Sequence, residues 1–148
     1  MSVDEPFDSH RWHDNAIHAF RIEEGPDGRG GVLILDIDFI VEWLPPNEGD
    51  AYSFRVAPAD LRFDDVDDLV IDIDYTVPPA ALCPLVIGEI QREAITFPGG
   101  RSSFAWTIQI HWPKDSVIRF TSPSLTQTLR SEPVGWGAQW LAPAQRPR

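Results

Sequence analysis

The sequence has a single cysteine and no long hydrophobic segment. Cys83 cannot form an intramolecular disulfide, which is typical of proteins from a reducing compartment. No unbroken apolar run is longer than four residues, as in Val32–Leu35, so the sequence predicts no membrane-spanning helix. The acidic start, Met1–Glu5, lacks the apolar segment of a secretory signal. We therefore expect a soluble cytoplasmic protein.

Positive charge is scarce, because one lysine and eleven arginines stand against 23 acidic residues. The net charge of −11 argues against nucleic acid and anionic membranes as partners, since both are negatively charged themselves. Most of the acidic residues lie within residues 1–75. Two interpretations stay open, a solvated surface that keeps the protein in solution or a surface that attracts a basic protein.

Motifs of nucleophilic and cofactor-dependent enzymes are also missing. The sequence has no Gly-x-Ser-x-Gly, no phosphate-binding loop and no dinucleotide fingerprint, so we expect no cofactor. Cys83 precedes Pro84 in an apolar stretch, which favours a buried small side chain over a reactive thiol. We assign no catalytic residue.

Helical periodicity is absent, and alternation of period two takes its place. In Val32–Trp43 one set of alternate side chains is wholly apolar and the other is mixed, as expected for a half-buried strand. The same alternation recurs in Leu69–Tyr75 and Phe104–Trp112. We expect Trp43 and Trp106 to be buried, because each shares its face with apolar neighbours. Shorter strands are predicted at 17–23, 52–57, 86–95 and 117–121.

Glycine, proline and aspartate separate these strands. Gly25–Gly31 is typical of a hairpin, and Gly88 of a bulge. The acidic run Asp64–Asp68 is typical of a solvated turn between strands. Ser124–Arg130 fits either a short helix or a strand. Further loops are expected at 45–50, 78–79 and 98–100.

These patterns predict an all-β fold. The simplest architecture is an antiparallel β-sandwich or open barrel of about seven to nine strands, with little or no helix. We expect one domain over residues 10–141. The flanking segments, residues 1–9 and 142–148, are polar or broken by proline, so they are expected to be loose.

Several phrases, taken in order, are shared with a known group of proteins. They are Trp12–Asn15, Leu33–Phe39, Glu42–Trp43, Phe54–Ala59, Val70–Asp74, Gln127 and Arg130–Val134. The set resembles a family of small, uncharacterised bacterial domains that open with Trp-His-Asp, over residues 11–141. The resemblance implies a mostly β single domain and no established activity. Similar small acidic β domains include immunity proteins, which implies an inhibitor of a basic toxin as one role.

The first candidate partner site consists of carboxylates on two predicted strands. Asp36, Asp38 and Glu42 share one face of one strand, and Asp72 and Asp74 share one face of another. If the strands are neighbours, these groups lie within about 5–8 Å of each other. Their repulsion would be relieved by water and salt, by a cation such as Ca²⁺, or by the arginines Arg21, Arg55 and Arg62. We assign no metal ligands.

The second candidate partner site is the opening Trp12-His13-Asp14. In the alternative interpretation, Trp12 packs under the sheet and His13 or Asp14 binds free backbone amides. His10 and His18 lie close by in sequence, but the spacing of these residues matches no metal motif.

Three function classes remain open. The first is a non-enzymatic, acidic protein-binding domain, in its most specific form an immunity-type inhibitor of a basic toxin. The second is a small-ligand or carbohydrate-binding domain with a cleft lined by Trp112, Trp136 or Trp140, although these tryptophans could instead plug one end of the fold. The third is a metal-dependent or carboxylate-pair enzyme. The oligomeric state is left open by the sequence.

Overall fold

The protein is an antiparallel β structure in the computed structural model, which describes residues 7–28, 30–46, 52–76 and 84–146. Its strands are β1 (Ala16–Glu24), β2 (Gly31–Leu44), β3 (Ser53–Asp72), β4 (Leu85–Thr96), β5 (Ser102–Trp112), β6 (Ser116–Ser122), β7 (Ser124–Leu129) and β8 (Val134–Trp136). A 3₁₀ turn, Pro143–Gln145, follows β8. Among the described residues there is no helix with the length and hydropathy needed to cross a bilayer. The predicted all-β class is confirmed.

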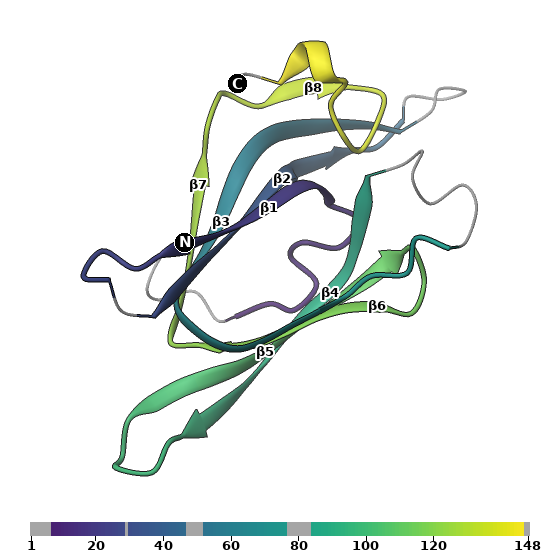
Figure 1. Cartoon of the computed structure of the whole chain (residues 1–148). Coiled ribbons are helices and arrows are strands. Elements are labelled where there is room, and N and C mark those ends of the chain that lie inside the picture. Colours follow the sequence, from purple (N-terminus) through teal and green to yellow (C-terminus); the bar gives the residue numbers. More distant parts are fainter. Residues whose placement is uncertain (1–6, 29, 47–51, 77–83, 147–148) are drawn as a thin grey trace.

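Six of the strands form a ring in the order β1–β2–β3–β6–β5–β4 (Figure 1). The ring closes where β4 returns to β1, and this junction consists of two residue pairs, Ala16 with Val86 and Ile17 with Leu85. Every other junction of the ring is longer; β1 and β2, for example, pair from Ala16 to Glu24. From this junction the two strands run on in opposite directions, β1 towards Glu24 and β4 towards Thr96, so they overlap only at their first residues.

The long strand β3 organises one side of the ring. One of its edges pairs with β2 up to Val66. Its other edge pairs in turn with β8, β7 and β6, which run antiparallel to it one after another. Ser124–Arg130, left open between helix and strand by the sequence, is therefore mainly the strand β7. The short strand β8 has no counterpart in the sequence prediction.

The acidic run predicted to be a turn lies inside β3, so that prediction was wrong. Asp65 and Asp68 have positive φ angles of 48° and 52°, and the pairing with β6 shifts register between Asp67 and Val70. Aspartate tolerates this left-handed conformation better than most residues. The run bends β3 as it passes from β7 to β6, and the chain does not reverse there.

The hairpin and bulge predictions are confirmed. Gly28 and Gly30 adopt positive φ angles of 72° and 67° in the turn between β1 and β2. At Gly88 the pairing of β4 with β5 shifts register. The loop at 98–100 connects β4 and β5. The loop predicted at 45–50 lies mostly outside the described residues, and that at 78–79 lies wholly outside them.

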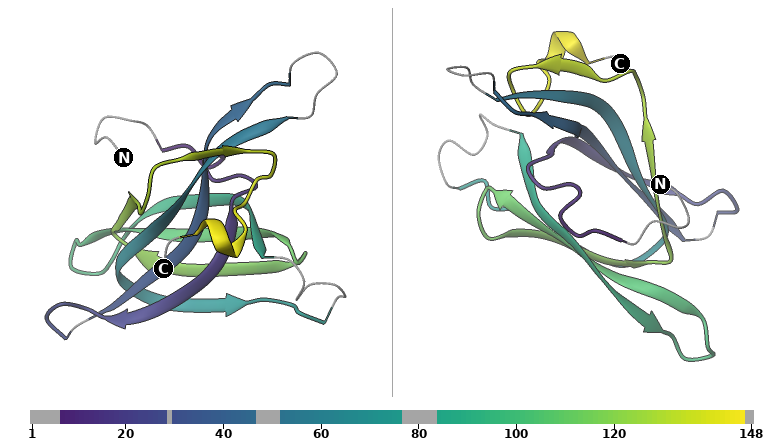
Figure 2. Two further views of the ribbon diagram at one scale, coloured as in Figure 1. Left: turned by 90° about the horizontal axis from the view of Figure 1, so that it is seen from above. Right: turned by 180° about the vertical axis from the view of Figure 1, so that it is seen from behind.

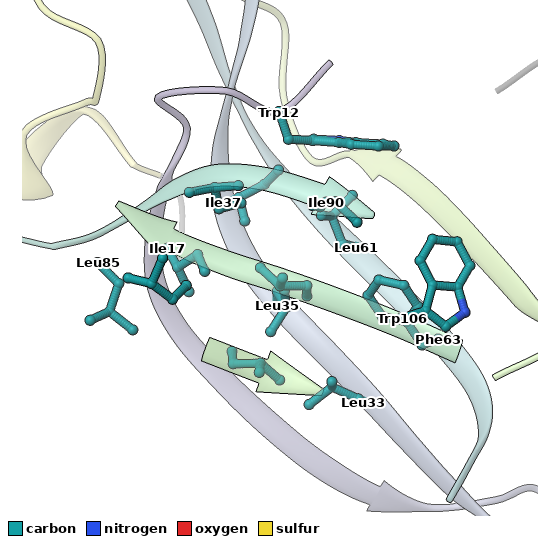
Figure 3. Packing of buried hydrophobic residues seen from close by; sticks show 14 of the residues in the cluster. Trp12, Ile17, Leu33, Leu35, Ile37, Leu61, Phe63, Leu85, Ile90 and Trp106 are labelled. Atoms are coloured by element: carbon teal, nitrogen blue, oxygen red, sulfur yellow. The ribbon is translucent and has the colours of Figure 1, made fainter. Parts of the chain in front are cut away.

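The main core fills the ring (Figure 3). Trp106 is 1% exposed, as predicted, and makes edge-to-face contacts with Phe63 and Phe104. Trp43 is 47% exposed, so its predicted burial was wrong. A register shift after Ile40 interrupts the alternation of β2, and Trp43 lies beyond it near the strand end, against Phe54.

Both chain ends pack on the ring over much of their described length. At the N-terminal end, Phe7 contacts Trp12 and Trp106, and the carbonyl of Ser9 accepts a hydrogen bond from the amide of Ile90. At the C-terminal end, residues 141–146 lie against β2, and Leu141 is 1% exposed. These placements differ from the loose ends that the sequence suggests. Residues 1–6 and 147–148 lie outside the described residues.

Candidate functional site

An open, largely apolar cleft lies beside the short junction of β1 and β4. Its volume is about 790 Å³. It is lined by residues 17–20 of β1, by Tyr75, Pro84, Leu85 and Trp136, and by residues 138 and 140–143 of the C-terminal segment. We call it the aromatic cleft, because Phe20, Tyr75 and two tryptophans line it.

The backbone of β1 explains one wall of the aromatic cleft. Four consecutive residues, Ile17 to Phe20, line it although alternate residues of a regular strand point to opposite faces. A register shift between Ile17 and Ala19 breaks the alternation here, and pairing with β4 ends at Ile17. The main-chain edge of β1 therefore runs along the cleft.

The opposite wall is the C-terminal segment, which lies over the outside of β2 (Figure 2). Trp136 is half-buried, and its indole N–H donates to the carbonyl of Trp140 at 3.1 Å. Leu141 is buried with Ile40, Phe54 and Val56 in a second, smaller core. This core anchors the segment that carries the tryptophans.

A buried carboxylate holds the C-terminal wall of the cleft in place. Asp38 is fully buried and accepts hydrogen bonds from the Leu141 amide at 2.7 Å, from His18 Nε2 at 2.8 Å and from Arg146 Nε at 3.0 Å. Burial raises the pKa of Asp38, but the bonds from His18 and Leu141 and the charge of Arg146 outweigh it, so its pKa is lowered overall. Asp38 is therefore an ionised acceptor that ties β1 and the C-terminal segment to β2.

A second carboxylate, Asp36, extends this network. Arg146 donates to both of its oxygens, through Nη2 at 2.5 Å and Nη1 at 3.2 Å, and Arg130 donates at 2.6 Å. Burial lowers the pKa of Arg146, but its bonds to Asp36 and Asp38 outweigh burial and raise it. We call Asp36, Asp38, His18, Arg130 and Arg146 the ionic clamp.

The structure does not gather the predicted acidic residues on one face. Register places Asp36 opposite Asp60, whereas Asp72 lies opposite Val117 of β6. Glu42 pairs with Arg55, one of the arginines predicted to relieve repulsion. The two acidic strands therefore do not meet side by side at these carboxylates. The reason is the bend of β3, which gives each half of that strand different neighbours.

The remaining two predicted arginines pair elsewhere. Arg21 pairs with Glu23 and Arg62 with Asp64, both close in sequence. The partners of Asp36 come from distant parts of the chain, so sequence reasoning missed Arg130 and Arg146. Sequence reasoning brings up His18 only in connection with metal binding, so it misses the bond from His18 to Asp38 as well. Charge alternation along one strand carries no signal for such long-range pairs.

The Trp12-His13-Asp14 segment is divided between interior and surface. Trp12 is 0% exposed, and its indole N–H donates to Gln127 Oε1 at 2.8 Å, so it cannot touch a partner in this structure. His13 is exposed; its Nδ1 donates to the Gly88 carbonyl at 2.8 Å, and its Nε2 lies 3.5 Å from Asp14. The predicted packing of Trp12 under the sheet is confirmed, whereas His13 binds a backbone carbonyl and Asp14 accepts a bond from the Gln139 side chain, so the predicted bonds to backbone amides are not seen among the described contacts.

The histidines of this region have separate partners. His10 lies 3.6 Å from Glu89, whereas His18 belongs to the ionic clamp. In the described ranges no group of three or more histidine, cysteine, aspartate or glutamate side chains is arranged to hold a metal ion. Of the three tryptophans proposed to line a cleft, Trp136 and Trp140 line the aromatic cleft and Trp112 does not.

Comparisons of the chain with family models, with curated proteins and with solved structures gave no match.

Proposed function

We propose that the protein is a non-enzymatic binding domain that holds a segment of a partner protein in the aromatic cleft. The observation that carries this proposal is the cleft itself. Its volume of about 790 Å³ falls within the range of roughly 300–1,000 Å³ that is usual for ligand sites. Half-buried tryptophans such as Trp136 and Trp140 are the residue type most often found as energetic anchors of protein interfaces.

The proposed partner is basic. The chain carries a net charge of −11, and Asp74 directly precedes Tyr75 of the cleft wall. A negative surface speeds the encounter with a positive partner and disfavours acidic ones. In its most specific form the proposal is an immunity-type role, in which the partner is a basic toxin. Glu42, Asp72 and Asp74 would then contribute attraction at long range, and the ionic clamp would shape the cleft.

A small ligand is the second candidate occupant of the aromatic cleft. Two tryptophans and a tyrosine in the lining offer flat surfaces, which suit the apolar face of a sugar or another flat molecule. A fragment screen by NMR, described below, separates this candidate from a protein partner.

The experiment is selection from a random peptide library displayed on phage, followed by affinity measurements on the selected peptides. We expect basic peptides that contain an apolar anchor. Trp140→Ala should weaken their binding about tenfold or more, since interface tryptophans are commonly worth over 1.4 kcal/mol. The matched control is Trp43→Ala, because Trp43 is exposed but lies outside the cleft lining.

Two outcomes would count against a protein partner. Selected peptides that bind Trp140→Ala as tightly as the parent would show that the cleft is not their site. A library that yields no binder, together with a fragment screen by NMR that shifts Trp136 and Trp140 resonances, would favour the small-ligand candidate instead.

A further inference from the structure

His18 belongs both to the ionic clamp and to the lining of the aromatic cleft, and its side chain is 22% exposed. Among the described lining residues there is no carboxylate, ammonium or guanidinium group. The polar side chains there are those of His18, Tyr75, Trp136 and Trp140. The indole N–H of Trp136 already donates to the carbonyl of Trp140. The imidazole of His18 is therefore the polar group best placed to select what the cleft binds.

The bond between His18 and Asp38 determines which nitrogen of the imidazole carries its proton. Asp38 is an ionised carboxylate, which accepts hydrogen bonds and cannot donate them. Nε2 of His18, 2.8 Å from Asp38, is therefore the protonated nitrogen. In the neutral imidazole the other nitrogen, Nδ1, then has a lone pair and acts as an acceptor. No described residue donates a hydrogen bond to Nδ1.

Asp38 makes Nδ1 of His18 a stronger acceptor. A carboxylate that accepts a bond from one nitrogen of an imidazole raises the basicity of the other nitrogen. The negative charge of Asp38 also lies 2.8 Å from the ring and disfavours an anion at Nδ1, although Arg146 offsets part of this charge at the other carboxylate oxygen. Nδ1 therefore selects a hydrogen-bond donor, and a positively charged donor before a neutral one.

The aromatic side chains of the cleft favour the same kind of ligand, because the face of an aromatic ring attracts a cation. Phe20 is 41% exposed and Tyr75 is 53% exposed, and both tryptophans of the lining are half-buried. Within the described residues, every contact between an arginine and a ring lies outside the cleft. The net charge of −11 adds attraction at long range. A cation brought by a partner therefore meets ring faces as well as Nδ1.

We propose that the aromatic cleft binds a lysine side chain of the partner, with its ammonium group donating to Nδ1 of His18. The aliphatic part of the lysine then packs against the aromatic rings of the lining. A compact ammonium group suits a single acceptor atom, whereas a guanidinium usually bonds to two oxygens at once. This assignment rests on the proposed function, because it names the part of the basic partner that enters the cleft.

Three small probes test this assignment in NMR titrations followed at the indole signals of Trp136 and Trp140. They are N-acetyl-lysine amide, its Nε-trimethylated form and N-acetyl-norleucine amide. The lysine probe should bind about tenfold or more tightly than the norleucine probe, because only lysine offers a charged donor. The trimethylated probe keeps the charge but has no ammonium hydrogen to donate, so it should bind more weakly than the lysine probe.

Two variants separate the acceptor role of His18 from its role in the ionic clamp. His18→Phe keeps a ring in the cleft but removes the acceptor, so the preference for lysine over trimethyl-lysine should disappear. Arg130→Gln weakens the clamp at Asp36 from outside the cleft lining, so it should leave that preference unchanged. Imidazole ¹⁵N NMR of the parent needs no variant: neutral His18 should carry its proton on Nε2, and its Nδ1 signal should shift with the lysine probe.

Either of two results would overturn the assignment. One is a neutral His18 that carries its proton on Nδ1, and the other is a lysine probe that binds no more tightly than the norleucine probe. Failure of the proposed function has a different signature. Phage-selected peptides that need Trp140 but keep their affinity when norleucine or arginine replaces lysine would leave the binding function standing and contradict the lysine site alone.

Discussion

At the scale of single residues, Asp38 is the most constrained side chain of the candidate site. It is a carboxylate with no exposed surface, yet its surroundings supply a backbone amide, an imidazole and a guanidinium as donors. If one member of such a group is removed, the others stay buried without a full set of hydrogen-bond partners. The resulting loss of folding stability is larger than the net stabilisation that the intact bonds provide. The contribution of Asp38 to folding stability therefore depends on its negative charge.

The lowered pKa of Asp38 predicts a specific dependence of stability on pH. Because its folded pKa lies below the unfolded value, its contribution is fully present above about pH 4 and is lost as pH falls through the folded pKa. Urea unfolding between pH 7 and pH 2.5 should show this loss in the parent. Asp38→Asn should lower the free energy of unfolding by about 2–4 kcal/mol at pH 7. The free energy of unfolding of this variant should also fall less steeply with decreasing pH than that of the parent.

Asp72→Asn is the control for this measurement, since Asp72 is exposed on β3. It should change stability at pH 7 by less than about 0.5 kcal/mol. If Asp38→Asn and the parent lost stability in parallel on acidification, Asp38 would not be the group responsible.

At the scale of elements, the C-terminal segment shows how a region without regular structure becomes ordered. Its described residues, 137–146, form one 3₁₀ turn, and their order comes from contacts with β2. Leu141 supplies apolar burial, and Arg146 supplies the bonds to Asp36 and Asp38. The aromatic cleft depends on this docking, because the segment forms one of its walls.

If the C-terminal segment is held less firmly against β2, the amide of Leu141 should exchange its hydrogen faster. Arg146→Gln removes a positive charge from two carboxylates and weakens their hydrogen bonds by about 1.5–3 kcal/mol. Hydrogen exchange at the Leu141 amide should accelerate about tenfold or more. Arg55→Gln is the control, since the Arg55–Glu42 pair is largely exposed. Equal exchange rates in both variants would mean that Leu141 is held by packing alone.

At the scale of the whole molecule, Trp12 joins parts of the chain that are far apart in sequence. It belongs to the main core, its ring lies 5.9 Å from that of Phe7, and its indole bonds to Gln127 of β7. The ring of strands closes through only two residue pairs at β1 and β4. Next to this junction, residues 9, 14 and 15 form backbone hydrogen bonds with Ile87 and Ile90 of β4, so the segment that carries Trp12 extends the closure of the ring.

Trp12→Phe should destabilise the protein by about 1–3 kcal/mol, because it leaves a space in the core and deprives Gln127 of its donor. Denaturant unfolding measures this change. The matched substitution Trp43→Phe should cost less than about 0.5 kcal/mol, as Trp43 is 47% exposed. A similar cost for both substitutions would contradict the closing role assigned to Trp12.

The sequence by itself determined most of the strands, the β1–β2 hairpin and the bulge at Gly88, because alternation and turn chemistry act between near neighbours. It left Trp112, Trp136 and Trp140 open between a cleft lining and a plug, and the structure places Trp136 and Trp140 in the cleft lining. Only the tertiary structure decided that Asp36 and Asp38 face Arg130, Arg146 and His18. Such pairs depend on the order of the strands in the sheet, and local sequence patterns do not determine that order. The same limit explains why Trp43 and Trp106 differ: each shares a strand face with apolar residues, but only Trp106 lies inside the ring.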